Sequence, residues 1–476
     1  METEILRADE KGLSRGAEIL RAGETVVFPT ETVYGLGADA TNEAAVKKIF
    51  DAKGRPSDNP LIVHIAEREA LSEIVKEIPE KAQLLMDSFW PGPLTIIMKK
   101  SESIPPCVSA GLDTVGVRMP ESVTARDFIR LSGKPVAAPS ANISGRPSPT
   151  TFADVCTDMK GRAAAIIEGE PSRVGVESTV IDMTCEVPTV LRPGGVTVQQ
   201  LEAVIGEVRR SNDAKDSKTP KAPGMKYRHY APKARVHILK GSLAEVKEFL
   251  KSKTGFAGKF GVLCFDEMKE ELSGLCETVS LGKMNCPEEA ANRLFSALRK
   301  MDTLGVGMIF APEIPEDGLW LAVRNRLYKA AAGSIIDVKT AKALLFICMG
   351  NTCRSPMAEG IFAAVNKNII TASAGLAAPV GEGANEKAVK AAKALGADIN
   401  SHRAKNVSAE MLEAADIIVT MTESIKRVIP FPEKTVTLYE LAGEAGDVAD
   451  PFGQPQEIYD ACAEEIKRLA EKYSKI

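Results

Sequence analysis

The segment LLFICMGNTCRSPMAEGIF, residues 344–362, predicts a strand, a tight loop and the start of a helix. The apolar run Leu344–Ile347 is typical of a buried strand, and a helix is expected from Ser355 onward. Cys348 ends the strand and Arg354 begins the helix, which gives the spacing C-x5-R. Strands that alternate with helices build parallel sheets. The segment therefore predicts an α/β domain that presents a cysteine at the end of a strand.

The loop between Cys348 and Arg354 has the composition of an anion-binding ring. Backbone N–H groups of such a loop point inward around phosphoryl oxygens, and the following helix N-terminus adds positive potential. Arg354 would supply two further donors in a planar fork. The same field favours the thiolate form of Cys348, to which Ser355 can donate a hydrogen bond. Gly350 and Asn351 tolerate the positive φ that such a loop requires.

A thiolate that attacks phosphorus also needs an acid to protonate the leaving group. The candidate is Asp450, which precedes Pro451 in the segment VADPFGQ, on a predicted loop before the last helix. In the alternative interpretation, C-x5-R arises by chance and Asp450 caps a helix. The strand before the cysteine, the CRSP helix start and the downstream Asp-Pro pair all argue against that alternative.

The motifs CMGNTCRSPMAEG and DPFG resemble the low-molecular-weight protein-tyrosine-phosphatase family over residues 343–476. This resemblance implies that Cys348 is the nucleophile, Arg354 the phosphate clamp, Ser355 the donor to the thiolate and Asp450 the general acid. It also implies phosphorylated proteins as substrates and no cofactor. The residues that would bind phosphate and set specificity are Met349, Gly350, Asn351, Thr352 and Cys353.

The resemblance leaves the substrate open. Arsenate reductases of the family share the loop but relay a disulfide through a downstream cysteine pair, and after Cys353 this chain has one cysteine, Cys462. Most tyrosine-specific members carry an aliphatic residue in place of Thr352, whereas a threonine in this context resembles bacterial protein-arginine phosphatases. The hydroxyl would help to place a water or a flat guanidinium, and Asp450 would pair with that guanidinium. We favour phosphoarginine, with phosphotyrosine as the alternative.

The composition of the chain is that of a soluble globular protein with several domains. Of its 476 residues, 44% are hydrophobic and 26% are charged, and the net charge is −4. That charge excludes a polyanion-binding chain as a whole, so a nucleic-acid contact would need a local patch. No apolar run is long enough to span a bilayer, no signal peptide is visible, and the nine cysteines lack metal-binding spacing. We expect a cytoplasmic location, no membrane association, and neither a disulfide scaffold nor a structural zinc.

The chain divides into four regions. Residues 1–206 alternate short apolar runs with helical stretches, which predicts an α+β domain around a large twisted sheet. Residues 207–232 are polar, contain Pro and Gly and predict a basic linker. Residues 233–338 predict a small Rossmann-like α/β domain, and residues 343–476 predict the second α/β domain with a parallel sheet. The strand candidates of the first region are TVVFPT (25–30), PLIVHI (60–65), LTIIMK (94–99), TVGVRMP (114–120), AAAIIEG (163–169) and STVIDM (178–183).

Polar clusters in the first region favour a nucleotide and a small polar ligand. In KGRPSDNP (53–60), Lys53 and Arg55 would share one face of an extended segment and bind one polyphosphate. APSANISGRPS (138–148) offers small hydroxyl and amide groups. The sequence contains neither a Walker loop nor a G-x-G-x-x-G turn, so a nucleotide would be bound in another way.

These clusters resemble the YrdC-like family of L-threonylcarbamoyladenylate synthases over about residues 10–205. The resemblance is carried by PTETVYGLG, by KxR and SxN at 53–59 and 140–142, and by WPGPLT. APGMKYRHYAP (222–232) and the region to residue 338 resemble the version with an appended Rossmann-like domain. The family implies the reaction of L-threonine, bicarbonate or CO2, and ATP to L-threonylcarbamoyl-AMP and pyrophosphate. The product would pass to the machinery that transfers threonylcarbamoyl to adenosine in tRNA.

The resemblance also implies the residues of the synthase site. Threonine would be bound by Thr32, His64, Arg118 and Ser178. ATP would be bound by Lys53, Arg55, Asn59, Ser140, Asn142, Ser148 and Arg192, with Tyr230 over the site. Magnesium is expected on ATP, although no carboxylate cluster marks its ligands. Two alternatives stay open: His64 as a satisfied core histidine, and the whole region as an RNA-binding module that stacks bases on Tyr227 and Tyr230.

Overall fold

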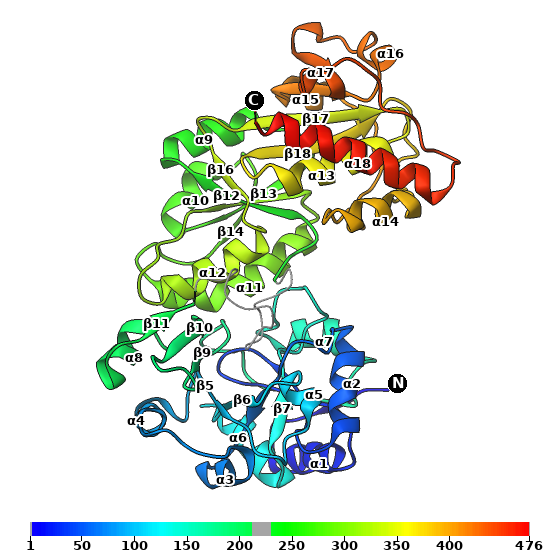
Figure 1. Cartoon of the computed structure of the whole chain (residues 1–476). Coiled ribbons are helices and arrows are strands. Elements are labelled where there is room, and N and C mark those ends of the chain that lie inside the picture. The colour runs from blue at the N-terminus through cyan, green and yellow to red at the C-terminus, as the bar shows by residue number, and fades with distance from the viewer. Residues whose placement is uncertain (1, 212–229, 476) are drawn as a thin grey trace.

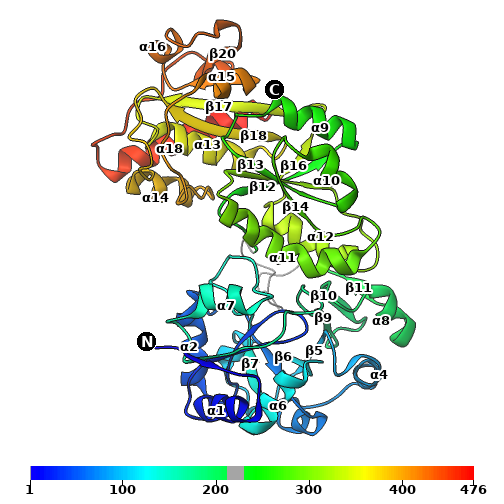
Figure 2. The same ribbon diagram turned by 180° about the vertical axis from the view of Figure 1, so that it is seen from behind.

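The structure is a computed structural model, and it describes residues 2–211 and 230–475. It contains three sheets, each in its own α/β unit, and the units follow one another along the molecule (Figures 1 and 2). The middle unit separates the first from the last. The multidomain architecture with one mixed and two parallel sheets confirms the predicted fold class.

The first unit is built on an eleven-stranded mixed sheet in the order β1-β8-β2-β3-β7-β4-β6-β5-β9-β10-β11. All six apolar runs predicted as strands are strands. The strands are β1 (Glu4–Leu6), β2 (Val26–Phe28), β3 (Gly35–Asp39), β4 (Ile62–His64), β5 (Leu94–Lys99), β6 (Thr114–Arg118), β7 (Val136–Ala138), β8 (Ala165–Ile167), β9 (Thr179–Asp182), β10 (Thr189–Arg192) and β11 (Arg209–Arg210). The helices are α1 (Glu10–Arg21), α2 (Glu43–Lys53), η1 (Arg68–Ala70), α3 (Leu71–Ile74), α4 (Glu80–Phe89), α5 (Pro106–Ser109), α6 (Val123–Ser132), α7 (Phe152–Met159) and α8 (Val198–Ile205).

The predicted linker begins later than expected. Arg209 and Arg210, which we assigned to it, add the short strand β11 to the sheet edge by pairing in parallel with β10. The polar composition of this segment predicted a linker, but its backbone hydrogen-bonds to β10. A strand at the edge of a sheet can carry polar side chains because they face solvent. The rest of the predicted linker, including Tyr227, lies at 212–229, outside the described residues.

The middle unit is a five-stranded parallel sheet in the order β14-β13-β15-β12-β16. This matches the alternation of apolar and helical segments in residues 233–338. Its strands are β12 (Arg235–Lys240), β13 (Phe260–Cys264), β14 (Glu277–Ser280), β15 (Met308–Pro312) and β16 (Ile335–Asp337). Its helices are α9 (Leu243–Ser252), α10 (Asp266–Leu272), α11 (Pro287–Leu304) and α12 (Trp320–Ala330).

The last unit has a four-stranded parallel sheet in the order β18-β17-β19-β20. Its strands are β17 (Lys342–Cys348), β18 (Ile369–Gly375), β19 (Ile417–Thr420) and β20 (Thr435–Thr437). Its helices are α13 (Arg354–Val365), α14 (Glu386–Ala394), α15 (Ala409–Ala414), α16 (Glu423–Lys426), η2 (Pro432–Lys434), α17 (Leu438–Leu441) and α18 (Gln456–Tyr473). The segment 344–362 thus forms β17, a loop and α13, as predicted.

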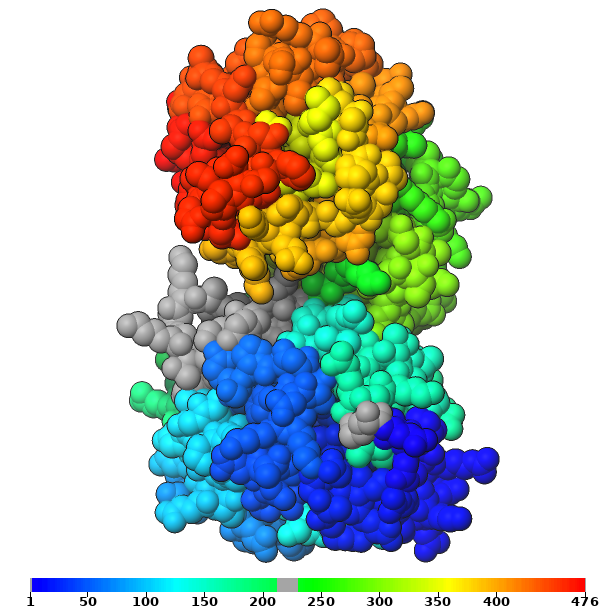
Figure 3. Space-filling view, turned by 90° about the vertical axis from the view of Figure 1, so that its right-hand side faces the viewer, coloured from blue at the N-terminus to red at the C-terminus, as the bar shows by residue number. Residues whose placement is uncertain are grey.

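Apolar packing joins the middle and last units. One continuous apolar cluster contains Phe249 and Phe256 of the middle unit together with Met411 and Leu412 of the last. The surfaces of the two units meet without a break in the space-filling view (Figure 3). Ion pairs also cross the boundary, including Lys253 with Asp416 at 2.6 Å. Within the described part of the chain, no helix is both long and apolar enough to cross a membrane.

Candidate active sites

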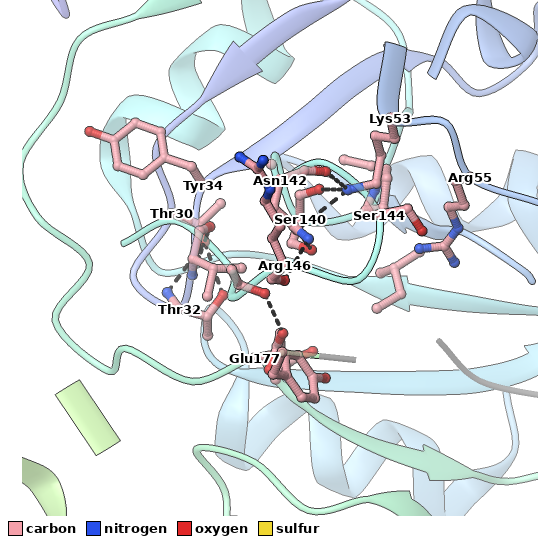
Figure 4. Close-up of a pocket in the computed structure, with 18 of the residues that line it drawn as sticks. Thr30, Thr32, Tyr34, Lys53, Arg55, Ser140, Asn142, Ser144, Arg146 and Glu177 are labelled. Atoms are coloured by element: carbon pink, nitrogen blue, oxygen red, sulfur yellow. Dashed lines mark hydrogen bonds between the residues drawn. The ribbon is translucent and has the colours of Figure 1, made fainter. Parts of the chain in front are cut away.

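A cavity in the first unit brings together the residues predicted to bind threonine and ATP (Figure 4). All four predicted threonine residues and, apart from Asn59, all the predicted ATP residues line it. Asn59 does not line the cavity, but its carbonyl accepts from Nη2 of Arg55 at 3.2 Å.

Arg118 stands at the end of β6 and is held on three sides. Its Nη1 donates to Oγ1 of Thr32 at 2.8 Å, its Nη2 to Oε1 of Glu31 at 2.5 Å and its Nε to the carbonyl of Gly92 at 3.2 Å. The side chains of Arg118 and Glu31 are both nearly fully buried. The sequence analysis missed Glu31, although it lies in the quoted PTETVYGLG motif. A buried arginine so oriented is prepared to bind a carboxylate.

His64 lines the same cavity from β4. Burial, with a smaller contribution from Arg118, lowers the pKa of His64 to about 3, so the ring is neutral at physiological pH. Its Nδ1 has no hydrogen-bond partner among the described residues. Backbone hydrogen bonds of the ring with Val136 and Ile62 oppose this lowering of the pKa but are outweighed by burial.

Ser178 and Arg192 form a second polar group in the cavity. Arg192 donates from Nε to the carbonyl of Ser178 and from Nη2 to its Oγ, both at 3.1 Å. Oγ of Ser178 also lies 2.8 Å from Oγ1 of Thr95. Burial lowers the pKa of Arg192 to about 10, which leaves it charged at neutral pH. A buried cation of this kind is stabilised by an anionic ligand.

Lys53 and Arg55 reach the same cavity, but not by the predicted geometry. Lys53 is the last residue of α2, and Gly54 caps that helix with φ of 61°. The two cations therefore do not alternate along an extended segment, and that argument was wrong. Lys53 Nζ donates to the carbonyls of Ser140 and Asn142, as the dashed lines in Figure 4 show. Burial holds the pKa of Lys53 well below its usual value.

Glu177 is a central residue of the cavity that the sequence analysis missed. Its Oε1 accepts from Ser148 at 2.7 Å, and its Oε2 accepts from Arg326 of the middle unit at 3.0 Å. Burial alone would raise the pKa of Glu177, but the guanidiniums of Arg326 and Arg192 outweigh it and lower that pKa. Arg326 is fully buried and does not itself line the cavity, so the middle unit supports the lining from behind Glu177.

Tyr230, which directly follows residues 212–229, lines the cavity. It is buried and stacks on Phe295 of α11, with ring centroids 5.1 Å apart. The next residue, Ala231, donates from its backbone N–H to the carbonyl of Gly145 at 2.8 Å. Since Phe295 occupies a face of the Tyr230 ring and the ring is buried, it cannot serve as an open platform for an RNA base.

The lining does not fit a magnesium ion held by the protein. Glu177 is the one carboxylate among the described residues that line the cavity, and it is already engaged by Arg326 and Ser148. Across residues 2–211 and 230–475, no three His, Cys, Asp or Glu side chains form a metal-binding group.

The second site lies where β17 ends and α13 begins. Sγ of Cys348 is 3.0 Å from Oγ of Ser355 and receives the backbone N–H of Asn351 at 3.2 Å. Asn351 has φ of 51°, as expected, whereas Gly350 has no positive φ. Cys348 is nearly fully buried. The geometry places hydrogen-bond donors around a sulfur at a helix N-terminus.

Arg354 and Asp450 meet at this site from opposite ends of the unit. Nη2 of Arg354 donates to Oδ2 of Asp450 at 2.5 Å, and its Nη1 donates to the carbonyl of Val448. The Asp450 side chain is half exposed, while that of Arg354 is buried. The arrangement brings the predicted acid next to the predicted phosphate clamp.

Thr352 lies beside Cys353 in the loop. Its Oγ1 is 3.7 Å from Sγ of Cys353, and Sγ of Cys353 is in turn 3.7 Å from the hydroxyl of Tyr459. Tyr459 is buried, so it is not an exposed aromatic wall of the site. Phe452, beside Asp450, is exposed. Of the two aromatic residues near the acid in sequence, Phe452 alone is free to contact a bound substrate.

Four further residues support the loop and were not predicted. Nδ2 of Asn351 donates to Oγ of Ser355 and of Ser373. Oδ1 of Asn351 accepts from the backbone N–H of Lys405, and its carbonyl lies 2.8 Å from Nε2 of His402. Ser373 donates to Glu359 at 2.6 Å. Glu359 lies within the quoted motif CMGNTCRSPMAEG, whereas Ser373, His402 and Lys405 lie outside it, where no local pattern marks them.

Comparisons with known proteins match three segments. Residues 18–194 match the Sua5, YciO and YrdC family model, described as telomere recombination. Residues 196–332 match the C-terminal domain of threonylcarbamoyl-AMP synthase. Residues 343–475 match the low molecular weight phosphotyrosine protein phosphatase.

Individual relatives cover the first two units. Threonylcarbamoyl-AMP synthase of Pyrococcus abyssi is 49% identical over 341 residues, which are 70% of this chain and 97% of the relative. The synthase of Bacillus subtilis is 46% identical over 336 residues, with the same coverage of both chains. The crystal structure of P. abyssi Sua5 complexed with L-threonine superposes with a TM-score of 0.66 at 47% identity, covering 71% of this chain and 99% of that one.

Proposed function

Since the chain belongs to the threonylcarbamoyl-AMP synthase family and carries a low-molecular-weight phosphatase domain at residues 343–475, we propose that it is a bifunctional enzyme. Its first two units make L-threonylcarbamoyl-AMP and pyrophosphate from L-threonine, bicarbonate or CO2, and ATP. The product is handed to the machinery that modifies adenosine in tRNA. The last unit hydrolyses phosphorylated proteins. We place both activities in the cytoplasm, where ATP is available and the thiol of Cys348 stays reduced.

The observation that carries the synthase proposal is the convergence of two ligand subsites in one cavity. Arg118 would bind the threonine carboxylate, and the neutral ring of His64 would hydrogen-bond a polar group of the same ligand. Arg55 and Arg192 are buried cations, with pKa values lowered to about 10 by burial, and a polyphosphate would compensate their charge. Lys53, held by two carbonyls, lies on the same wall. The crystal structure of the P. abyssi relative with L-threonine supports threonine as the amino acid.

We assign the chemistry of this site to orientation and exclusion of water. No side chain in the described lining is placed as an evident base for carbamoylation of the threonine amine. Burial of Arg118, Arg192 and Tyr230 keeps the reacting groups away from bulk water. The threonine amine would add to CO2 and lose a proton, and the carbamate oxygen so formed would attack the α-phosphorus of ATP as the bond to pyrophosphate breaks.

A product assay tests the proposal. The full chain is incubated with ATP, bicarbonate and labelled L-threonine, and the products are separated. Formation of labelled threonylcarbamoyl-AMP with equimolar pyrophosphate supports it. Steep salt-dependent RNA binding without ATP turnover would favour the RNA-binding alternative.

In the phosphatase half, the Cys348 thiolate would attack phosphorus and form a thiophosphate ester, while Asp450 protonates the leaving group. Water would then hydrolyse the ester to free phosphate and restore the thiolate. The ion pair between Arg354 and Asp450 suggests an order of events. When a phosphoryl group binds Arg354, its charge replaces that of Asp450, which is then free to take up a proton.

We propose phosphoarginine as the preferred substrate, supported by Thr352 in the loop and by Asp450 beside the leaving group. Wild-type enzyme should show a higher kcat/KM on phosphoarginine peptides than on phosphotyrosine peptides. Thr352→Ile should shift the ratio towards phosphotyrosine by about ten- to a hundredfold, because a lost polar contact is worth roughly 1–3 kcal/mol.

Thr352→Val is the matched variant for this test. It removes the hydroxyl with little change in volume. A shift in substrate ratio that both variants show is therefore caused by loss of the hydroxyl, and a shift that only Thr352→Ile shows is caused by the larger side chain. A wild-type preference for phosphotyrosine that Thr352→Ile leaves unchanged would return the domain to the tyrosine-specific alternative.

Oxidation should inactivate the phosphatase reversibly through a disulfide between Cys348 and Cys353. The two cysteines lie on one short loop, and the thiolate is the form of a thiol that peroxide oxidises first. Sulfenic acid at Cys348 would be attacked by the Cys353 sulfur with loss of water. Burial raises the pKa of Cys353, so Cys348 should react first.

Activity after peroxide and then dithiothreitol measures this. Cys353→Ser should keep the initial activity and lose most of the recovery, while Cys462→Ser should behave like wild type. Intact-mass spectra of the oxidised wild type identify the product. A mass increase from over-oxidised Cys348, without the loss of two hydrogen atoms that marks a disulfide, would count against the disulfide.

A further inference from the structure

Arg235 of the middle unit contacts the phosphatase unit beside its catalytic loop. It begins β12, and its Nη1 donates to Oγ1 of Thr371 on β18 at 2.7 Å. The same nitrogen lies 3.3 Å from Oε1 of Glu359 on α13. Both side chains of this ion pair are largely buried, with 25% and 19% of their surfaces exposed. Arg235 thus bridges α13, which begins at the end of the loop from Cys348 to Arg354, and β18, which pairs with β17.

A chain of hydrogen bonds continues from Glu359 to the catalytic sulfur. Oγ of Ser373 donates to Oε2 of Glu359 at 2.6 Å. Since a serine hydroxyl has a single proton, Ser373 must act as acceptor towards Nδ2 of Asn351, at 2.9 Å. The backbone N–H of Asn351 donates to Sγ of Cys348 at 3.2 Å. A carboxylate can only accept, so Glu359 fixes Ser373 as its donor, and Ser373 then accepts from Asn351.

Asn351 needs this support because its backbone is in the left-handed region, with φ of 51°. A non-glycine residue keeps such a conformation when its surroundings over-determine it. The Asn351 amide is the group through which Ser373 and Ser355 hold the residue in place. A change in the Glu359 carboxylate would therefore reach the N–H that faces the sulfur.

We propose that Arg235, a residue of the middle unit, is a positioning residue of the phosphatase active site. It fixes and neutralises the Glu359 carboxylate, which orients Ser373 and through it Asn351. Without the guanidinium, Glu359 is a partly buried carboxylate with no cation against it, close to the site of the thiolate. Such a charge draws in water or turns away, and it also disfavours a second negative charge nearby. This inference rests on the proposed phosphatase activity.

The test compares Arg235→Ala with Lys253→Ala in the full chain. Lys253 is the matched control, because its ion pair with Asp416 also crosses the boundary between the two units. Asp416 in turn accepts from the backbone N–H of Ala343, at the other end of β17 from Cys348. The readouts are kcat and KM on p-nitrophenyl phosphate, the rate of Cys348 alkylation by iodoacetamide at fixed pH, and Tm.

Arg235→Ala should lower kcat about fivefold to tenfold with little change in KM, and slow alkylation by a similar factor. Arg235→Lys should recover part of both losses, since it restores a cation without the planar fork. Adding Glu359→Gln to Arg235→Ala should also recover activity, because the amide still accepts from Ser373 and leaves no unpaired charge. Lys253→Ala should leave both rates unchanged even where it lowers Tm.

Equal effects of Arg235→Ala and Lys253→Ala would overturn the proposal, as would additive effects in the double variant. An inactive wild type would instead refute the proposed phosphatase activity. The alkylation rates, which need no turnover, would then still decide whether Arg235 acts on Cys348.

Discussion

Cys348→Ser abolishes phosphatase activity and leaves synthesis of threonylcarbamoyl-AMP unchanged: this is the expected result for a chain with two independent sites. Loss of a covalent nucleophile typically lowers kcat by roughly a thousandfold or more. Serine at this position would be protonated at neutral pH and would not attack phosphorus. The measurement is kcat on p-nitrophenyl phosphate, with adenylate formation assayed on the same protein sample.

Asp450→Asn separates the acid from the nucleophile. An asparagine cannot give a proton to the leaving group, but it leaves the loop around Cys348 intact. Its kcat should fall strongly on phenyl phosphate and much less on p-nitrophenyl phosphate, whose leaving group departs without a proton. Equal losses on both esters would contradict the role of Asp450 as general acid.

Arg118→Ala should raise the threonine requirement of the synthase by roughly thirtyfold to a few thousandfold. Removing one partner of a buried, hydrogen-bonded charge pair costs roughly 2–5 kcal/mol. The variant would also leave Glu31 buried without its cation, which adds repulsion towards the threonine carboxylate. KM for threonine at saturating ATP measures the effect, and Tm shows whether the variant is folded.

Lys53→Ala tests the proposed ATP subsite of the same cavity. It should mainly raise KM for ATP, because Lys53 lies beside Ser140 and Asn142 rather than beside Arg118. Arg118→Lys should recover part of the threonine affinity, since it keeps the charge but not the fork. If both alanine variants changed both substrates equally, the division of the cavity into two subsites would be wrong.

Much of the phosphatase site was predictable because a single strand–loop–helix segment carries it. Cys348, Arg354 and Ser355 lie within one short stretch, so local geometry alone brings them together. The apolar runs that became strands are also local signals, since burial of a strand requires apolar side chains along it. The line of polar clusters in the first region predicted ligand contacts, and almost all of those residues line one cavity.

The sequence alone predicted six strands of the first sheet, the segment from β17 to α13 and the short motif that carries the nucleophile. Only the tertiary structure decided the partners of the charged groups: Glu31 with Arg118, Arg326 with Glu177 and Arg235 with Glu359. Each pair joins residues from different elements, and two of the three join different units. Their side chains meet because whole sheets and helices pack, and no local periodicity encodes that packing. For the same reason Lys53 and Arg55 reach one cavity from a helix end and the loop after it, although their spacing had suggested a single extended strand.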